Sequence, residues 1–191
     1  MYENGLGVRQ DYNKAIELYV LSADQGYMNA QNNLDHMYHY GLGVGQDYKK
    51  AVELYILSAE QGYMKAQSNL GYMYYKGLGV VQDHKKAVEL YVLSAEQGHM
   101  IAQSNLGYIY QNGLGVNKDI LAAFKYFKQS MDQGYDQAKE SLIKLIKDNP
   151  EIILSQVSNI SISFDLFEIL DTSDRIISGL SFVNLIKAFL A

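Results

Sequence analysis

The chain has 191 residues, of which 48% are hydrophobic and 19% charged, so it is able to bury a core and does not have the composition of a disordered tail. Its 16 basic and 21 acidic residues give a net charge of -5, which argues against nucleic-acid binding because that depends on clustered lysine and arginine. There is no apolar run of membrane-spanning length, no signal-peptide pattern at the first residues and no cysteine, so we expect a cytoplasmic protein without disulfides or thiolate metal sites.

The dominant pattern is an internal repeat of 36 residues, in which the tetrapeptide Gly-Leu-Gly-Val starts at positions 5, 41, 77 and 113. Eight positions differ between residues 41–76 and 77–112, so 28 of the 36 are identical. The outer units, 5–40 and 113–148, follow the same pattern more loosely. Self-similarity at this period predicts a solenoid over residues 1–148, in which each unit packs against its neighbours.

Within each unit the sequence predicts two helices. In the second unit these run from about residue 48 to 61 and from 64 to 76, and Gly62 and Gly77 end them, since glycine often supplies the left-handed residue after a helix. An aspartate precedes the first helix of every unit and is expected to cap its free amide groups. These aspartates are Asp11, Asp47, Asp83 and Asp119.

Small and large side chains alternate along the faces expected to be buried. On the first helix of the second unit, Tyr55 lies between two alanines four residues away, and the second helix carries Gly71 on its core side. Small residues let two helix axes approach, while tyrosine rings fill the gaps between neighbouring pairs. The remaining arc, with Lys49, Glu53 and Glu60, is expected to face water.

A recurring set of small, aromatic and charged residues runs from the second helix of one unit into the first helix of the next. Its members are Ala66, Leu70, Gly71, Tyr74, Gly77, Gly79, Val80, Asp83, Lys86, Ala87, Tyr91, Ala95 and Gly98. This set resembles the Sel-1-like repeat, a relative of the tetratricopeptide repeat, over about residues 1–148. The resemblance implies an all-α fold, a right-handed α/α-solenoid with a non-repeat C-terminal tail, in which the helix with Leu70 and Gly71 comes first in each repeat.

Two further features qualify this resemblance. Asp35 and Ile143 stand where the pattern has the glycine, so we expect helices to approach less closely there. The near-identical units and the composition rich in tyrosine, isoleucine and asparagine also resemble the repeat arrays of amoeba-infecting giant viruses, which implies the host cytoplasm as the location.

Beyond residue 148 the repeat ends and the composition changes, since all 17 tyrosines precede residue 136. Pro150 suits the first turn of a short helix over 150–158. Residues 161–164 alternate like a strand, and the apolar spacing over 173–190 favours a helix. We expect residues 149–191 to cap the solenoid, with a docking helix for a partner or a second subunit as the alternative.

The units differ most along one face of the second helix, formed by positions i, i+3, i+7 and i+10. In successive units these are Asn29, Asn32, His36 and His39; Lys65, Ser68, Tyr72 and Tyr75; Ile101, Ser104, Tyr108 and Gln111; and Gln137, Glu140, Lys144 and Lys147. In tetratricopeptide relatives the corresponding face lines the concave groove that receives peptides, so the resemblance implies that a partner binds here. The alternative is that Tyr72 and Tyr108 pack between repeats.

Two other patterns resemble ligand sites, but we expect each to have a structural role only. His36 and His39 lie three residues apart beside Asp35, a spacing able to hold a metal, but the sequence places no further ligand, so we expect a solvated surface pair. The recurring glycine loop lacks the third glycine of a dinucleotide-binding loop and the Gly-Lys-Ser/Thr of a P-loop, so we interpret it as a turn. We expect no metal and no cofactor.

The sequence therefore predicts a non-enzymatic scaffold or adaptor that binds a peptide or protein segment on its concave face. The alternatives are a structural spacer or self-assembling repeat protein and, less favoured, an enzyme resembling the β-lactamase-like cysteine-rich relatives, whose disulfides this chain lacks. We expect neither a nucleic-acid nor a membrane partner, and a monomer or a weak oligomer that associates through the open N-terminal repeat.

Overall fold

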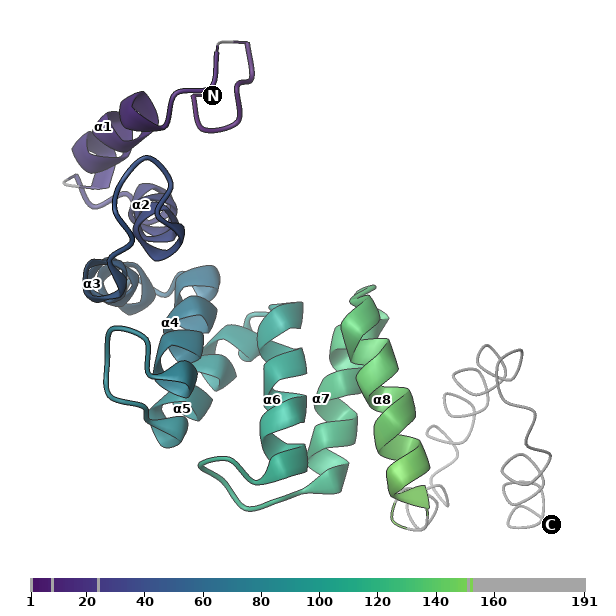
Figure 1. Ribbon diagram of the computed structural model, residues 1–191. Helices are drawn as coiled ribbons and strands as arrows, with labels where there is room; N and C mark the ends of the chain where they lie inside the picture. The colour runs from purple at the N-terminus through teal and green to yellow at the C-terminus, as the bar shows by residue number, and fades with distance from the viewer. Residues whose placement is uncertain (1, 8, 24, 151, 153–191) are drawn as a thin grey trace.

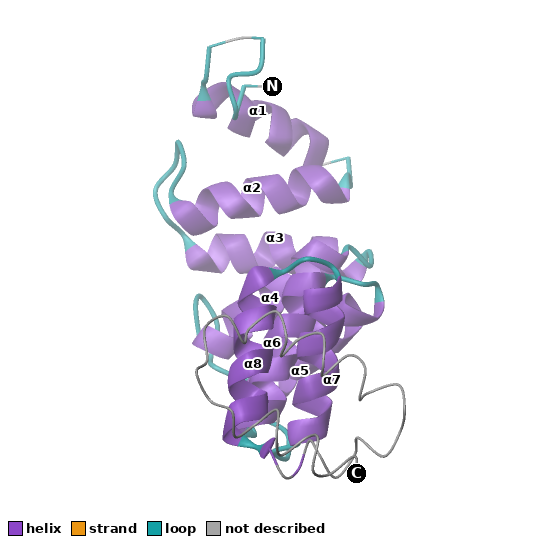
Figure 2. Cartoon of the chain, turned by 90° about the vertical axis from the view of Figure 1, so that its right-hand side faces the viewer, coloured by secondary structure: helices purple, strands orange, loops and turns teal. Residues whose placement is uncertain are grey.

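The computed structural model describes residues 2–7, 9–23, 25–150 and 152, and this part of the chain forms eight α-helices and no strand (Figure 1, Figure 2). The helices are α1 (Tyr12–Ala23), α2 (Met28–Tyr40), α3 (Tyr48–Glu60), α4 (Met64–Lys76), α5 (His84–Glu96), α6 (Met100–Asn112), α7 (Ile120–Asp132) and α8 (Asp136–Asp148). None of these helices is long and apolar enough to span a bilayer. The prediction of an all-α repeat solenoid is confirmed.

The ends of the helices follow from the residues that flank them. A carboxylate oxygen of Asp47 accepts hydrogen bonds from the backbone N–H groups of Lys49 and Lys50, both at 3.1 Å, and so begins α3. Equivalent caps are formed by Asp11, Asp83 and Asp119. Gly77 has a φ of +72° and its N–H donates to the carbonyl oxygen of Met73, which closes α4 at the predicted residue.

The helices form a bent stack. The helices α1 to α3 succeed one another along one direction and α5 to α8 along another, so the array bends near α4, and α2 and α4 lie on the concave side of α1, α3 and α5 (Figure 1). The pairs α2–α3, α4–α5 and α6–α7, each joined by a glycine loop, pack more extensively than the pairs α1–α2, α3–α4 and α5–α6. The closest-packed unit is therefore an even-numbered helix and the helix that follows it.

Each of these close pairs buries an aromatic ring at one shared position of the repeat. Tyr55 of α3, Tyr91 of α5 and Phe127 of α7 occupy the same position of the repeat, and all three are at most 2% exposed. Tyr74 packs against the apolar cluster on either side of it and so joins two of these cores. Truncation of such a ring to alanine costs about 3–5 kcal/mol. The rings therefore hold each helix pair together.

Two of these rings need a glycine opposite them. A Cβ atom at Gly71 would lie 3.1 Å from the ring of Tyr91, and one at Gly107 would lie 2.6 Å from the ring of Phe127. Carbon atoms in contact normally lie about 3.5–4.0 Å apart. The prediction that Gly71 allows a close helix crossing is confirmed, and the same holds for Gly107.

Partly buried hydrogen bonds also join neighbouring units, and the sequence pattern did not predict them. The hydroxyl of Ser58 donates to the carbonyl oxygen of Met28 at 2.8 Å. The side-chain amide of Gln61 donates to Oε1 of Gln31 at 2.8 Å, and Nε2 of Gln31 donates in turn to the carbonyl oxygen of Ala23. The unit-to-unit bonds recur between Ser94 and Met64, Ser130 and Met100, Gln97 and Gln67, and Gln133 and Gln103. Because a buried polar group needs a partner, these bonds fix the register of one unit on the next.

The predicted C-terminal elements lie outside the described residues. This holds for the strand-like segment 161–164 and the helix over 173–190, and for all of 150–158 except Pro150 and Ile152. The proposed boundary near residue 148 coincides with the end of α8, where the backbone N–H of Asn149 donates to the carbonyl oxygen of Leu145. The role of residues 149–191 as a cap or docking segment stays a prediction.

Gly107→Ala is expected to destabilise the protein more than Gly71→Ala. In a helix interior alanine is favoured over glycine by about 1 kcal/mol, whereas overpacking costs about 1–3 kcal/mol. At Gly71 the ring of Tyr91 has to move slightly, so we expect the two effects to cancel, whereas Phe127 has to move further and a net loss should result. Chemical denaturation followed by circular dichroism measures both variants. A stability gain at Gly107 would show that the ring is not fixed in place.

Candidate functional site

The twelve residues predicted to line the concave face of the first three units all lie on α2, α4 and α6. Eleven of them are exposed or half-buried, and we call the surface they form the inner face: Asn29, Asn32, His36, His39, Lys65, Tyr72, Tyr75, Ile101, Ser104, Tyr108 and Gln111. Ser68 is 3% exposed, so the prediction that it faces a partner is wrong. The equivalent residues of α8, Gln137, Glu140, Lys144 and Lys147, are exposed.

Aromatic rings on the inner face touch from one unit to the next. The ring centroids of Tyr75 and Tyr108 are 6.4 Å apart in an edge-on arrangement. His39 and Tyr72, the same pair of positions one unit earlier, are 6.5 Å apart. Tyr72 and Tyr108 nevertheless remain 40% and 49% exposed. These rings therefore pack between repeats and are accessible to a partner at the same time.

A pocket of about 270 Å³ lies on the inner face between α4 and α6. Its lining comprises Tyr72, Tyr75, Lys76, Tyr91, Asn105, Tyr108 and Ile109. Three of these are predicted site residues, whereas Lys76, Tyr91, Asn105 and Ile109 were not predicted. A signal for Lys76 is present, since the equivalent residues of the flanking units are Tyr40 and Asn112. No sequence signal separates Tyr91 from an ordinary core residue.

The ammonium group of Lys76 lies over the tyrosines of this pocket. Its Nζ is 4.9 Å from the ring centroid of Tyr75 and 6.0 Å from that of Tyr72. Such cation–π contacts contribute about 0.5–1 kcal/mol at exposed sites. The ion pairs within the described residues, Lys14–Glu17 and Lys128–Asp132, do not involve Lys76. Its charge therefore stands at the pocket without a carboxylate partner from this part of the chain.

Tyr91 lines the same pocket although its side chain is only 1% exposed. Burial, followed by the proximity of Tyr72 and Tyr75, raises the pKa of Tyr91, so its hydroxyl stays protonated at neutral pH. Burial and then the neighbouring hydroxyl of Tyr108 raise the pKa of Tyr75 in the same way. Protonated hydroxyls, an ammonium group and the amide of Asn105 all offer hydrogen-bond donors. The pocket is therefore suited to a group that accepts hydrogen bonds.

The two histidines of α2 differ in environment. His36 is exposed, as expected of a surface pair, but His39 is half-buried, with ring centroids of Tyr40 and Tyr48 at 4.5 and 5.3 Å. Burial and then the neighbouring His36 lower the pKa of His39. The described residues contain no group of three or more His, Cys, Asp or Glu side chains placed to hold a metal ion. The prediction of a solvated pair is right for His36 and wrong for His39.

Asp35, the residue that replaces the glycine in α2, is completely buried. Neither of its carboxyl oxygens has a hydrogen-bond partner of normal geometry among the described residues. Burial raises the pKa of Asp35 to about 9, and the nearby hydroxyl of Tyr55 and backbone amide of His36 offset only part of this effect. The carboxyl group is therefore neutral at pH 7. The looser contact expected here is not found, because α2 and α3 pack nearly as extensively as the other close pairs and Tyr55 stays buried.

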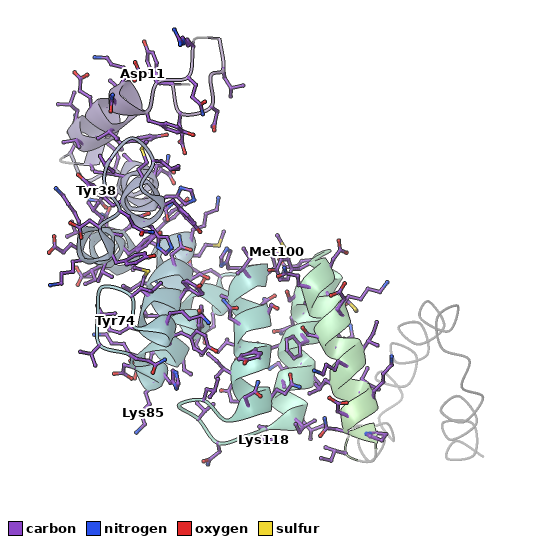
Figure 3. All side chains as sticks on the ribbon, viewed as in Figure 1. Asp11, Tyr38, Tyr74, Lys85, Met100 and Lys118 are labelled. Carbon is purple, nitrogen blue, oxygen red and sulfur yellow. The ribbon has the colours of Figure 1, made fainter. Side chains whose placement is uncertain are left out.

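A larger hollow, of about 570 Å³, lies beside the start of α1, near the labelled Asp11 in Figure 3. The side chain of Gln10 in its lining already donates to the carbonyl oxygen of Glu3 and the hydroxyl of Tyr12. One unit later Gln46 makes the same two bonds, to the carbonyl oxygen of His39 and the hydroxyl of Tyr48. These groups belong to the connection between units, so we assign no site to this hollow.

Comparison with known families gives a match to the Sel1 repeat. The matched residues are 1–27, 29–63, 65–99 and 101–135. The last three stretches each begin within an even-numbered helix and include the next helix, so they coincide with the helix pairs that pack most closely. No curated protein matches the chain.

Several solved structures are similar to this chain. A Sel1 repeat protein from Oxalobacter formigenes is 34% identical with a TM-score of 0.68, over 74% of this chain and 58% of that one. The protective antigen c5321 of uropathogenic Escherichia coli, which has an SLR fold, is 31% identical with a TM-score of 0.75, over 94% of this chain and 40% of that one. Helicobacter pylori cysteine rich protein B is 25% identical with a TM-score of 0.53, over 68% of this chain and 92% of that one. The chain thus spans less than two thirds of the first two proteins.

The buried carboxyl of Asp35 predicts a pH-dependent stability. Its pKa is raised from 3.8 to about 9 by folding, so the folded state is favoured at low pH and loses stability as the pH rises from about 4 to 9. The loss is on the order of 1 kcal/mol per pH unit over this range. Asp35→Asn, which has no proton to lose, should lack this slope. Denaturant titrations of both proteins from pH 4 to pH 9 measure the difference, and parallel stability curves would contradict the assignment.

Proposed function

Because the chain belongs to the Sel1 repeat family, we propose that it is a protein-interaction scaffold whose inner face binds a peptide or protein segment. The observation that carries this proposal is the set of accessible rings of Tyr72, Tyr75 and Tyr108 around the pocket between α4 and α6. Tyrosine offers a large contact area with few rotors to freeze on binding. Of the eight positions at which the two central units differ, two lie on the inner face, Lys65/Ile101 and Tyr75/Gln111, and we propose that partner specificity resides there.

A structural spacer or self-assembling array is the second candidate. The observation that favours it is a row of exposed leucines on the odd-numbered helices: Leu21, Leu57 and Leu93 occupy one repeat position and are 56%, 49% and 49% exposed. Oligomeric state separates the two candidates. A scaffold of the proposed kind stays monomeric in sedimentation at rising concentration, whereas an array associates through these leucines or its first repeat.

An enzymatic function has weaker support. Ser141 and Lys144 on α8 have the Ser-x-x-Lys spacing of penicillin-binding enzymes, a pair that sequence reasoning missed. The accompanying Ser-Asp-Asn and Lys-Thr-Gly motifs are absent from the sequence. The chain also has no cysteine, in contrast to the name of the similar Helicobacter protein. We therefore propose no catalytic activity.

Replacement of Tyr72, Tyr75 and Tyr108 together by alanine is expected to abolish capture of the partner from a cell lysate. The loss is about 1–4 kcal/mol for each ring that acts as a hot spot. The matched control replaces Lys49, Glu53 and Glu60, which are exposed on α3, and should retain the partner. Circular dichroism has to show both variants folded, because the rings also pack between repeats.

The opposite pattern would refute this assignment. If the α3 variant loses the partner while the folded tyrosine variant keeps it, the binding surface lies on the odd-numbered helices.

A further inference from the structure

We infer that the pocket between α4 and α6 receives a carboxylate of an acidic peptide segment. The inference rests on the proposed function and names the chemistry of the partner. Three features of the described residues support it: the distribution of charge between the two sets of helices, the donors in the pocket, and the position of the pocket within the repeat array.

Charge is divided unevenly between the even- and odd-numbered helices. Although the whole chain has a net charge of -5, the helices α2, α4 and α6 carry two lysines, Lys65 and Lys76, and both are exposed. The acid within these three helices is Asp35, which is completely buried. The neighbouring helices α1, α3 and α5 carry five exposed glutamates and five exposed lysines, so these helices have no net charge. The exposed charge of α2, α4 and α6 is therefore positive within an acidic protein, and it comes from Lys65 and Lys76, of which Lys76 lines the pocket.

The pocket concentrates hydrogen-bond donors next to this positive charge. Lys76 is held over the rings of Tyr72 and Tyr75, and Tyr91 and Asn105 line the same space. An ionised carboxylate accepts several such bonds and donates none. Bonds between charged partners are shorter and stronger than neutral ones. A carboxylate therefore adds a charge-assisted bond with Lys76 that a neutral amide or a cation does not make.

Of the three close helix pairs, α4–α5 alone combines a glycine on its first helix with a tyrosine ring opposite it on its second helix. In the α4–α5 pair, Gly71 leaves room beside the hydroxyl-bearing ring of Tyr91. One unit earlier the carboxyl group of Asp35 stands opposite Tyr55, and one unit later Phe127 has no hydroxyl. The α4–α5 pair thus differs from its two neighbours, because it has a tyrosine hydroxyl and no carboxyl group at this contact.

The size of the pocket fits a side chain. Small-molecule sites usually measure about 300–1,000 Å³, whereas this pocket measures about 270 Å³. This space admits an acidic side chain of an extended segment together with water, and the neighbouring exposed ring of Tyr108 and side chain of Ile101 offer apolar contact to the rest of the segment.

The test uses three fluorescein-labelled peptides of one length, (Glu-Ala)5, (Gln-Ala)5 and (Lys-Ala)5, with the full chain in fluorescence polarisation at low salt. We expect the acidic peptide to bind at least about tenfold more tightly than the neutral one, the difference that a charge-assisted hydrogen bond makes. The basic peptide should not bind. Added salt should weaken the acidic complex because exposed charges are screened.

Two variants locate the binding. Lys76→Gln removes the charge and keeps the stem, and should weaken binding of (Glu-Ala)5 by about tenfold. Lys49→Gln, the matched control on α3, should leave binding unchanged. Tyr91→Phe removes the hydroxyl and keeps the ring, as the equivalent Phe127 does naturally, and should also weaken binding.

The remaining outcomes separate this inference from the scaffold proposal. Equal binding of the acidic and neutral peptides, with loss in the tyrosine triple variant, overturns the carboxylate inference and leaves the scaffold proposal intact. Acidic-peptide binding that survives both Lys76→Gln and the tyrosine triple variant overturns both. No binding of (Glu-Ala)5 at millimolar concentration overturns the carboxylate inference.

Discussion

The packing of one buried aromatic ring against the preceding helix is the contact on which this structure depends. In the α4–α5 pair the ring of Tyr91 lies against Gly71, where a Cβ atom would lie 3.1 Å from the ring. Because the ring fits there, α4 and α5 pack as a close pair, and Tyr91 also lines the pocket between α4 and α6. The same interaction thus stabilises the fold and shapes the candidate site.

Small changes at this contact alter the chemistry of each unit without altering its backbone. Asp35 places a neutral, buried carboxyl where Gly71 has a hydrogen atom, and the cost of ionising this buried group lowers stability as the pH rises. Phe127 fills the ring position without a hydroxyl. The serine and glutamine bonds between units recur through these changes, so the register of the stack is preserved. A repeat that keeps its inter-unit hydrogen bonds while the residues at the ring contact vary is able to change its binding surface without changing its backbone.

Much of the fold follows from the sequence because its signals are local and repeated. The period of 36 residues, the capping aspartates and the glycines after the helices place the helix ends to within a residue in the second unit. The site was less predictable. A face defined on one helix includes Tyr72 and Tyr75 but also the buried Ser68, and it omits Tyr91, which comes from the next helix and meets the others only through tertiary packing. Likewise His39 is covered by rings of Tyr40 and Tyr48, which helix periodicity does not show.

A partner segment on the inner face, across the pocket between α4 and α6, is detectable by paramagnetic relaxation in the isotope-labelled chain, with (Glu-Ala)5 carrying a nitroxide at one end. We expect broadening of the amide signals of Tyr72, Tyr75 and Tyr108, with those of Leu57 and Leu93 on the odd-numbered helices unchanged. Broadening centred on Leu57 and Leu93, with the three tyrosine signals unaffected, would contradict this placement.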